Sequence, residues 1–109
     1  MTADEVKEII EIQKQGDSGS KNDHGIALQQ ALVPPQKITI IVREVRQGEI
    51  KESKEEVWLV GRENSENGYR IIMREDGLQF GLASPGLPQD KFPVFVGWYG
   101  ALASAFLCM

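Results

Sequence analysis

Few side chains in this sequence have the chemistry for catalysis or metal binding. His24 is the single histidine and Cys108 the single cysteine, so they cannot supply the four ligands of a structural zinc site. His24 follows Asp23 in a stretch rich in glycine and serine, and no nucleophile is signalled near it. No basic residue lies close to Cys108 to activate its thiol. We therefore predict no metal site, no cofactor and no catalytic residue, with His24 in an exposed loop and Cys108 buried.

Carboxylates leave an enzymatic alternative open. Glu56, Glu75 or Asp90 would act as a general acid or base if an apolar pocket kept it protonated. The sequence alone does not show which of them is buried. The glycines form neither of the common phosphate-binding motifs, G-x-x-x-x-G-K-S/T and G-x-G-x-x-G, so a nucleotide site is not indicated.

Aromatic, aliphatic and arginine side chains on the expected strands are the candidates for binding a ligand or a partner. Arg70 and Arg74 lie two positions on either side of Ile72, so they share one face of a strand and could clamp an anion. The alternative is pairing with glutamates such as Glu56 or Glu75 across the sheet. Tryptophan and tyrosine are enriched at protein interfaces. The candidate binding residues are Trp58, Arg70, Ile72, Arg74, Trp98 and Tyr99.

Two helices are predicted ahead of the strands. Thr2 and Glu5 have the spacing of a capping box, and apolar residues then recur on one helical face, which predicts a helix over about 3–15. Residues 16–25 have the composition of a loop, and 26–32 predict a second, short helix.

Runs with the period of two typical of strands follow, separated by turn signals that contain glycine. The polar run 51–56 would prolong the first hairpin into a long arm that faces solvent. Residues 57–60 are apolar in both registers, which predicts a strand covered on both faces. Residues 101–109 favour a helix, with a sixth strand as the alternative. The predicted strands are 37–46, 56–63, 69–75, 78–83 and 92–99.

These elements predict an α+β fold with one or two N-terminal helices packed on a bent, mostly antiparallel five-stranded meander. Gly61, Gly81 and Gly97 lie within strands, where glycine often marks a bend, so a partial barrel is the alternative to an open sheet. We expect residues 1–109 to form a single domain, with 1–25 as a helix plus a mobile loop and 26–109 as the sheet core.

The composition is ordinary for a globular protein and limits the partners. The net charge is −4 and no basic block is present, so nucleic acid would be repelled on average. The first residues lack the apolar core of a signal peptide, and we predict a cytoplasmic protein. Residues 92–109 carry no formal charge, but Pro93, Gly97 and Gly100 interrupt them, so we expect no membrane association.

The leading hypothesis is a non-catalytic module that binds a small molecule or a protein and acts as a homo-oligomer. It depends on the aromatic residues of the strands and on the apolar last residues, which would suit a subunit interface. A second hypothesis is a stoichiometric inhibitor of the immunity-protein kind, since a small acidic protein can neutralise a basic partner through charge complementarity. The small enzyme with a buried carboxylate is the third.

Overall fold

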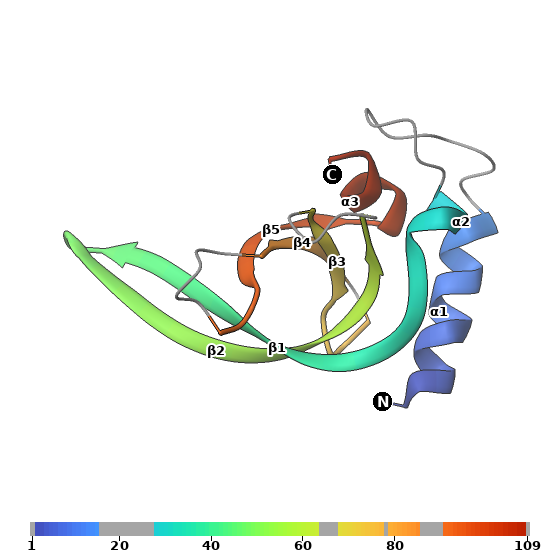
Figure 1. Cartoon of the computed structure of the whole chain (residues 1–109), viewed down its shortest axis with the longest axis horizontal. Coiled ribbons are helices and arrows are strands. Elements are labelled where there is room, and N and C mark those ends of the chain that lie inside the picture. Colours follow the sequence, from blue (N-terminus) through green and yellow to red (C-terminus); the bar gives the residue numbers. More distant parts are fainter. Residues whose placement is uncertain (1, 16–27, 64–67, 78, 86–90, 109) are drawn as a thin grey trace.

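The structure, a computed structural model, describes residues 2–15, 28–63, 68–77, 79–85 and 91–108. In Figure 1, α1 lies beside the first half of β1, and the β1–β2 hairpin projects away from the rest of the fold. Within the described ranges the elements follow in the order α1 (Ala3–Gln15), α2 (Leu28–Ala31), β1 (Leu32–Arg46), β2 (Glu49–Arg62), β3 (Arg70–Met73), β4 (Phe80–Ser84), β5 (Val94–Gly100) and α3 (Leu102–Leu107).

The five strands form a closed barrel in the order β1-β2-β3-β4-β5. Strands that follow each other in the chain pair antiparallel, whereas β5 meets β1 in parallel. At this closure the Ile41 N–H donates to the Pro93 carbonyl oxygen at 2.8 Å. The α+β class and the antiparallel order are confirmed. The open meander is corrected to a barrel, because register shifts beside Gly61 and Gly81 bend the strands and bring the first and last together.

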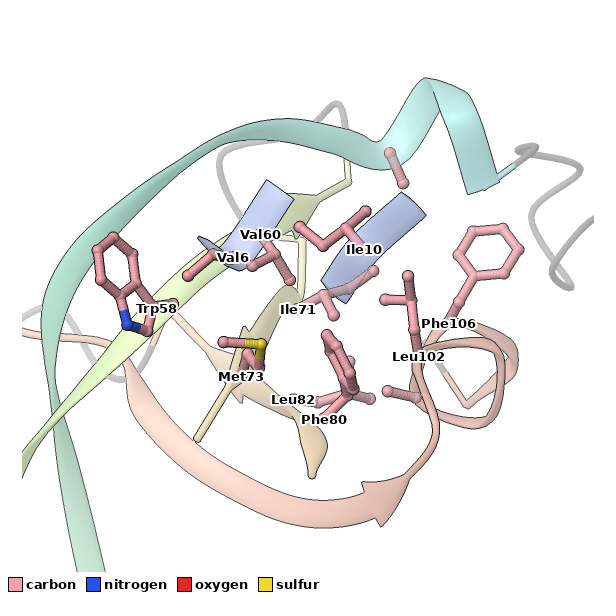
Figure 2. Packing of buried hydrophobic residues seen from close by; sticks show 12 residues of the cluster. Val6, Ile10, Trp58, Val60, Ile71, Met73, Phe80, Leu82, Leu102 and Phe106 are labelled. Atoms are coloured by element: carbon pink, nitrogen blue, oxygen red, sulfur yellow. The ribbon is translucent and has the colours of Figure 1, made fainter. Parts of the chain in front are cut away.

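Buried apolar side chains form two clusters on opposite faces of the strands. The helix-side cluster combines residues of β2, β3 and β4 with the buried faces of α1 and α3 (Figure 2). The strand cluster receives side chains from all five strands. Adjacent residues alternate between them, so Trp58 belongs to the first and Val57 to the second. Residues 57–60 are all buried, which confirms the prediction of a strand covered on both faces.

α1 has the bounds that its sequence predicts. The Glu5 N–H donates to Thr2 Oγ1 and the Thr2 N–H donates to Glu5 Oε1, each at 3.3 Å, which completes the capping box. Further along α1, the Leu102 N–H at the start of α3 donates to Gln13 Oε1 at 3.1 Å. The side chain of α1 thus satisfies a backbone group that α3 leaves unpaired at its first turn.

β1 begins earlier than predicted. It starts at Leu32, directly after the single turn of α2, and includes Pro34 and Pro35. The register shifts between Leu32 and Gln36, so the prolines lie where the ladder is interrupted and their missing N–H groups cost no ladder hydrogen bond. The part of the predicted 26–32 helix that precedes residue 28 lies outside the described residues.

The charge-free C-terminal stretch divides into β5 and α3, which confirms the preference for a helix after residue 101. Phe106 is fully buried, whereas Leu107 is 47% exposed and Cys108 is exposed. The prediction of a buried Cys108 is therefore wrong, because the thiol follows the last buried turn of α3. Among the described helices, none combines the length and the apolar character needed to cross a membrane.

Candidate functional site

The arm, defined as the end of the β1–β2 hairpin from Arg43 to Glu56, is the most prominent surface feature (Figure 1). Every residue in it is exposed. The chain reverses at Gln47 and Gly48, whose φ angles of 52° and 80° suit a tight two-residue hairpin turn. The register of β1 and β2 is unbroken from residue 36 to the turn, so the arm is a direct continuation of barrel strands. The long hairpin that the polar run 51–56 predicted is confirmed.

Two large aliphatic side chains lie opposite each other near the tip of the arm. Val45 is 75% exposed and Ile50 is 71% exposed, and the register pairs them. A single exposed aliphatic residue is ordinary. A pair of exposed aliphatic residues at the end of a projecting two-stranded ribbon is less ordinary. Such a ribbon has little stability of its own, and covering these side chains would stabilise it.

The charges of the arm nearly balance. Residues 43–56 contain four basic and five acidic side chains. Arg43 pairs with Glu52 at 3.1 Å and Arg46 pairs with Glu44 at 3.0 Å. Ion pairs this exposed contribute about 1 kcal/mol at most. An arm with no excess of basic side chains lacks the electrostatic attraction that basic arms have for nucleic-acid phosphates, and its mixed charges suit a protein surface.

β2 has an open outer edge along the arm. β3 pairs with β2 only from Trp58 onward, so no strand of the described chain lies beside residues 49–57 on the side away from β1. The Ile41 N–H points to β5, hence away from β2, and Ile41 stands opposite Lys54. In an antiparallel pair, the backbone N–H and C=O groups of two opposed residues either point toward each other or both point away. The two arrangements alternate along the strand. The outward backbone groups on this edge therefore belong to Ile50, Glu52, Lys54 and Glu56.

The structure brings two of the predicted binding residues, Arg74 and Trp98, together. The Arg74 guanidinium carbon lies 5.9 Å from the centre of the Trp98 ring, within cation–π range, and the centre of the Phe95 ring lies 5.1 Å from that of Trp98. Arg74 also pairs with Asp76 at 3.1 Å. Trp98 fits here because residue 81 is glycine, since a Cβ on Gly81 would lie 2.7 Å from the indole. The result is a half-buried aromatic pair beside an exposed arginine.

Of the other predicted binding residues, Ile72 lies in the strand cluster against which Trp98 packs, and the remaining three occupy separate places. Trp58 is 6% exposed in the helix-side cluster, and Ile72 is fully buried in the strand cluster. Arg70 donates a long hydrogen bond of 3.5 Å to the Gly68 carbonyl oxygen. Tyr99 is 36% exposed. The structure thus divides the six residues between two cores and separate parts of the surface, and their role in binding stays a prediction.

Open depressions adjoin α1 and the base of the arm. One of about 370 Å³ lies where the arm leaves the barrel, and all of its lining side chains except Val57 are charged and exposed. Ligand sites for small molecules are mostly apolar and enclosed, so this hollow is better suited to a segment of protein. Another, of about 600 Å³, lies between α1 and the start of β1. The smaller depression is lined by Glu55, Glu56, Val57, Arg74, Glu75 and Asp76.

The carboxylates of the enzymatic hypothesis that the structure describes lie on the surface. The Glu56 and Glu75 side chains are 70% and 46% exposed, and their oxygens lie 3.8 Å and 3.2 Å from Lys37 Nζ. Neither has the apolar pocket that acid–base catalysis by a carboxylic acid needs. Asp90 and His24 lie outside the described residues. The part of the chain that is described contains no group of three or more His, Cys, Asp or Glu side chains that could hold a metal ion.

Sequence reasoning predicted the arm but missed the residues that make it a candidate site. Val45 and Ile50 were not among the candidates, although each stands two positions from the Gln47-Gly48 turn, on opposite sides of it. That symmetric spacing was the available signal, because residues equidistant from a two-residue turn face each other across the hairpin.

No family model matches the chain, and neither a curated protein nor a solved structure matches it.

Proposed function

We propose that this protein is a non-catalytic protein-interaction module that acts as a homo-oligomer and uses the arm as its contact surface. The observation that carries the proposal is the Val45–Ile50 pair, 75% and 71% exposed at the tip of a ribbon that projects from the barrel. Covering these side chains would remove apolar surface from water.

The backbone of the arm supports the same proposal. In the described part of the chain no strand pairs with the outer edge of β2, where the N–H and C=O groups of Ile50, Glu52, Lys54 and Glu56 point outward. Exposed edges of this kind recruit a further strand in many protein complexes. A ribbon of two strands is marginally stable in water, whereas three or more strands with a shared apolar face hold together.

The test compares the oligomeric state of the wild-type chain with that of an arm variant. Val45→Thr/Ile50→Thr removes the apolar patch but keeps β-branched side chains, so the strands retain their preference for extended structure. Val96→Thr is the matched control, since Val96 is 47% exposed on β5. Sedimentation velocity and native mass spectrometry would be measured over a wide concentration range, with circular dichroism to check folding.

We expect the wild type and Val96→Thr to associate to dimers or larger species, and the arm variant to remain monomeric. A wild-type chain that stays monomeric at every concentration would overturn the proposal and favour an inhibitor with a different protein as its partner. An arm variant that associates as tightly as the wild type would show that the contact surface lies elsewhere.

A further inference from the structure

We infer that two copies of this chain pair through the outer edge of β2, antiparallel and about a twofold axis that passes by Ser53. The inference rests on the proposed function and goes beyond it by naming the strand edge and the register. The occupant of the open edge is thus a second copy of the same segment, residues 50–56.

The backbone geometry allows this pairing. The axis at Ser53 sets residues whose numbers sum to 106 opposite each other. Glu52 then faces Lys54 of the second copy, and Ile50 faces Glu56. All four of these residues point their backbone groups outward, so opposed residues can exchange N–H···O=C hydrogen bonds. The backbone N–H and C=O groups of Ser53 point toward β1. Ser53 therefore faces Ser53 of the second copy on the axis as a non-hydrogen-bonded pair.

The charges select this register. With the axis at Ser53, Glu52 faces Lys54 and Lys51 faces Glu55, and each pair occurs twice by symmetry. Moving the axis by one residue sets Glu52 against Glu52, or Lys54 against Lys54. Like charges directly opposite each other destabilise a strand pair, and opposite charges stabilise it. Charged side chains on an exposed strand edge can also serve to prevent pairing with another strand. That role does not require opposite charges to face each other when residues 50–56 pair with a second copy of themselves.

The β1 edge of the arm is the less suitable surface. β5 already occupies β1 at Ile41, which leaves only residues 42–46 without a neighbouring strand in the described part of the chain. On β2 the open segment extends from residue 49 to residue 57. The longer edge offers more backbone groups to a second strand.

The hollow at the base of the arm receives the tip of the second copy. In the proposed register, Glu49 of the second copy stands opposite Val57, which lines the depression of about 370 Å³ together with Arg74. Four carboxylates, those of Glu55, Glu56, Glu75 and Asp76, line the same hollow, and Arg74 already pairs with Asp76, so charge does not favour this contact and the register rests on the strand edge itself. Ile50 of the second copy lies opposite Glu56 and diagonal to Trp58, a distance that large side chains bridge.

The test is a charge swap between two full-length variants. In Glu55→Lys the introduced lysine faces Lys51 of the second copy, and in Lys51→Glu the introduced glutamate faces Glu55. Each variant alone should therefore lose self-association, with a dissociation constant raised about tenfold or more, since both symmetric contacts become repulsive. Mixing the two variants restores opposite charges at both contacts, so we expect a heterodimer. Glu8→Lys, which makes the same charge change on an exposed residue of α1, should associate as the wild type does.

Amide hydrogen exchange followed by NMR gives a second readout. The N–H groups of residues 51, 53 and 55 point toward β1 in the monomer and the dimer alike. Those of residues 50, 52, 54 and 56 point away from β1 and would be bonded to the second copy in the proposed dimer. Protection of the even-numbered amides at high protein concentration, and its loss on dilution, is the expected result.

The outcomes separate the inference from the proposed function. If Glu55→Lys associates as the wild type does while Val45→Thr/Ile50→Thr does not, the arm remains the contact surface and the β2 register is overturned. If the mixed variants form no heterodimer although the wild type dimerises, the register is again refuted. If the wild type never associates, both proposals fall.

Discussion

Replacing Gly81 by alanine tests how closely β4 and β5 approach each other. A Cβ at this position would overlap the Gly97 carbonyl oxygen and lie 2.7 Å from Cε3 of Trp98. The carbonyl belongs to the backbone of β5, so it cannot move without disturbing the pairing that holds β4 to β5. The indole could turn away, but it would then leave Phe95 and Arg74.

The expected loss follows from two opposing effects. Overpacking a well-filled site costs about 1–3 kcal/mol. Replacing glycine by alanine also restricts the unfolded chain, which returns about 0.4–1 kcal/mol. Because the nearest obstacle is backbone, we place the cost at the upper end and expect Gly81→Ala to lower the free energy of unfolding by about 2–3 kcal/mol. For a domain near this size, each kcal/mol corresponds to about 4–8 °C in the melting temperature.

Gly97→Ala is the matched control. This glycine lies on the neighbouring strand, and a Cβ there would meet nothing closer than the Tyr99 ring at 3.6 Å, an ordinary contact. We expect the control to be neutral or to gain up to about 1 kcal/mol. Urea unfolding followed by circular dichroism and by tryptophan fluorescence would measure both variants. A Gly81→Ala protein as stable as Gly97→Ala would refute the close approach of the two strands.

Further predictions concern the helices that cover the helix-side cluster. Phe106→Ala should lower the free energy of unfolding by about 3–5 kcal/mol, because Phe106 is fully buried. Its control Leu107→Ala, at a residue that is 47% exposed, should cost about 1 kcal/mol or less. Similar costs for the two variants in urea unfolding would contradict the packing of α3. Gln13→Leu should cost about 0.5–2 kcal/mol because it removes the acceptor for the Leu102 N–H, and Gln13→Glu, which keeps an acceptor oxygen, should lose less. Equal thermal stability of the two Gln13 variants would show that this hydrogen bond contributes nothing.

Local patterns in the sequence were sufficient for most of the secondary structure. The capping box at Thr2 and Glu5 set the start of α1, because its two hydrogen bonds join residues only three positions apart. Alternating apolar residues predicted the strands, and the polar run 51–56 predicted the long arm, whose register the structure shows to be set by a turn at Gln47 and Gly48. Residues 57–60 could be recognised as covered on both faces because neither register is polar. Each of these features depends on residues close together in the chain.

Only the tertiary structure decided how these elements meet. Closure of the barrel depends on bends distributed over several strands, and its parallel contact joins Ile41 to Val94, which no local pattern pairs. The approach of Arg74 to Trp98 depends on the pairing of both β3 and β5 with β4, and Cys108 is exposed because it follows the last buried turn of α3. Gln13 and Leu102 are 89 residues apart in the chain, yet they share a hydrogen bond. Periodicity and turn chemistry report which face of an element is apolar, whereas the partner of that face is chosen by packing among distant segments.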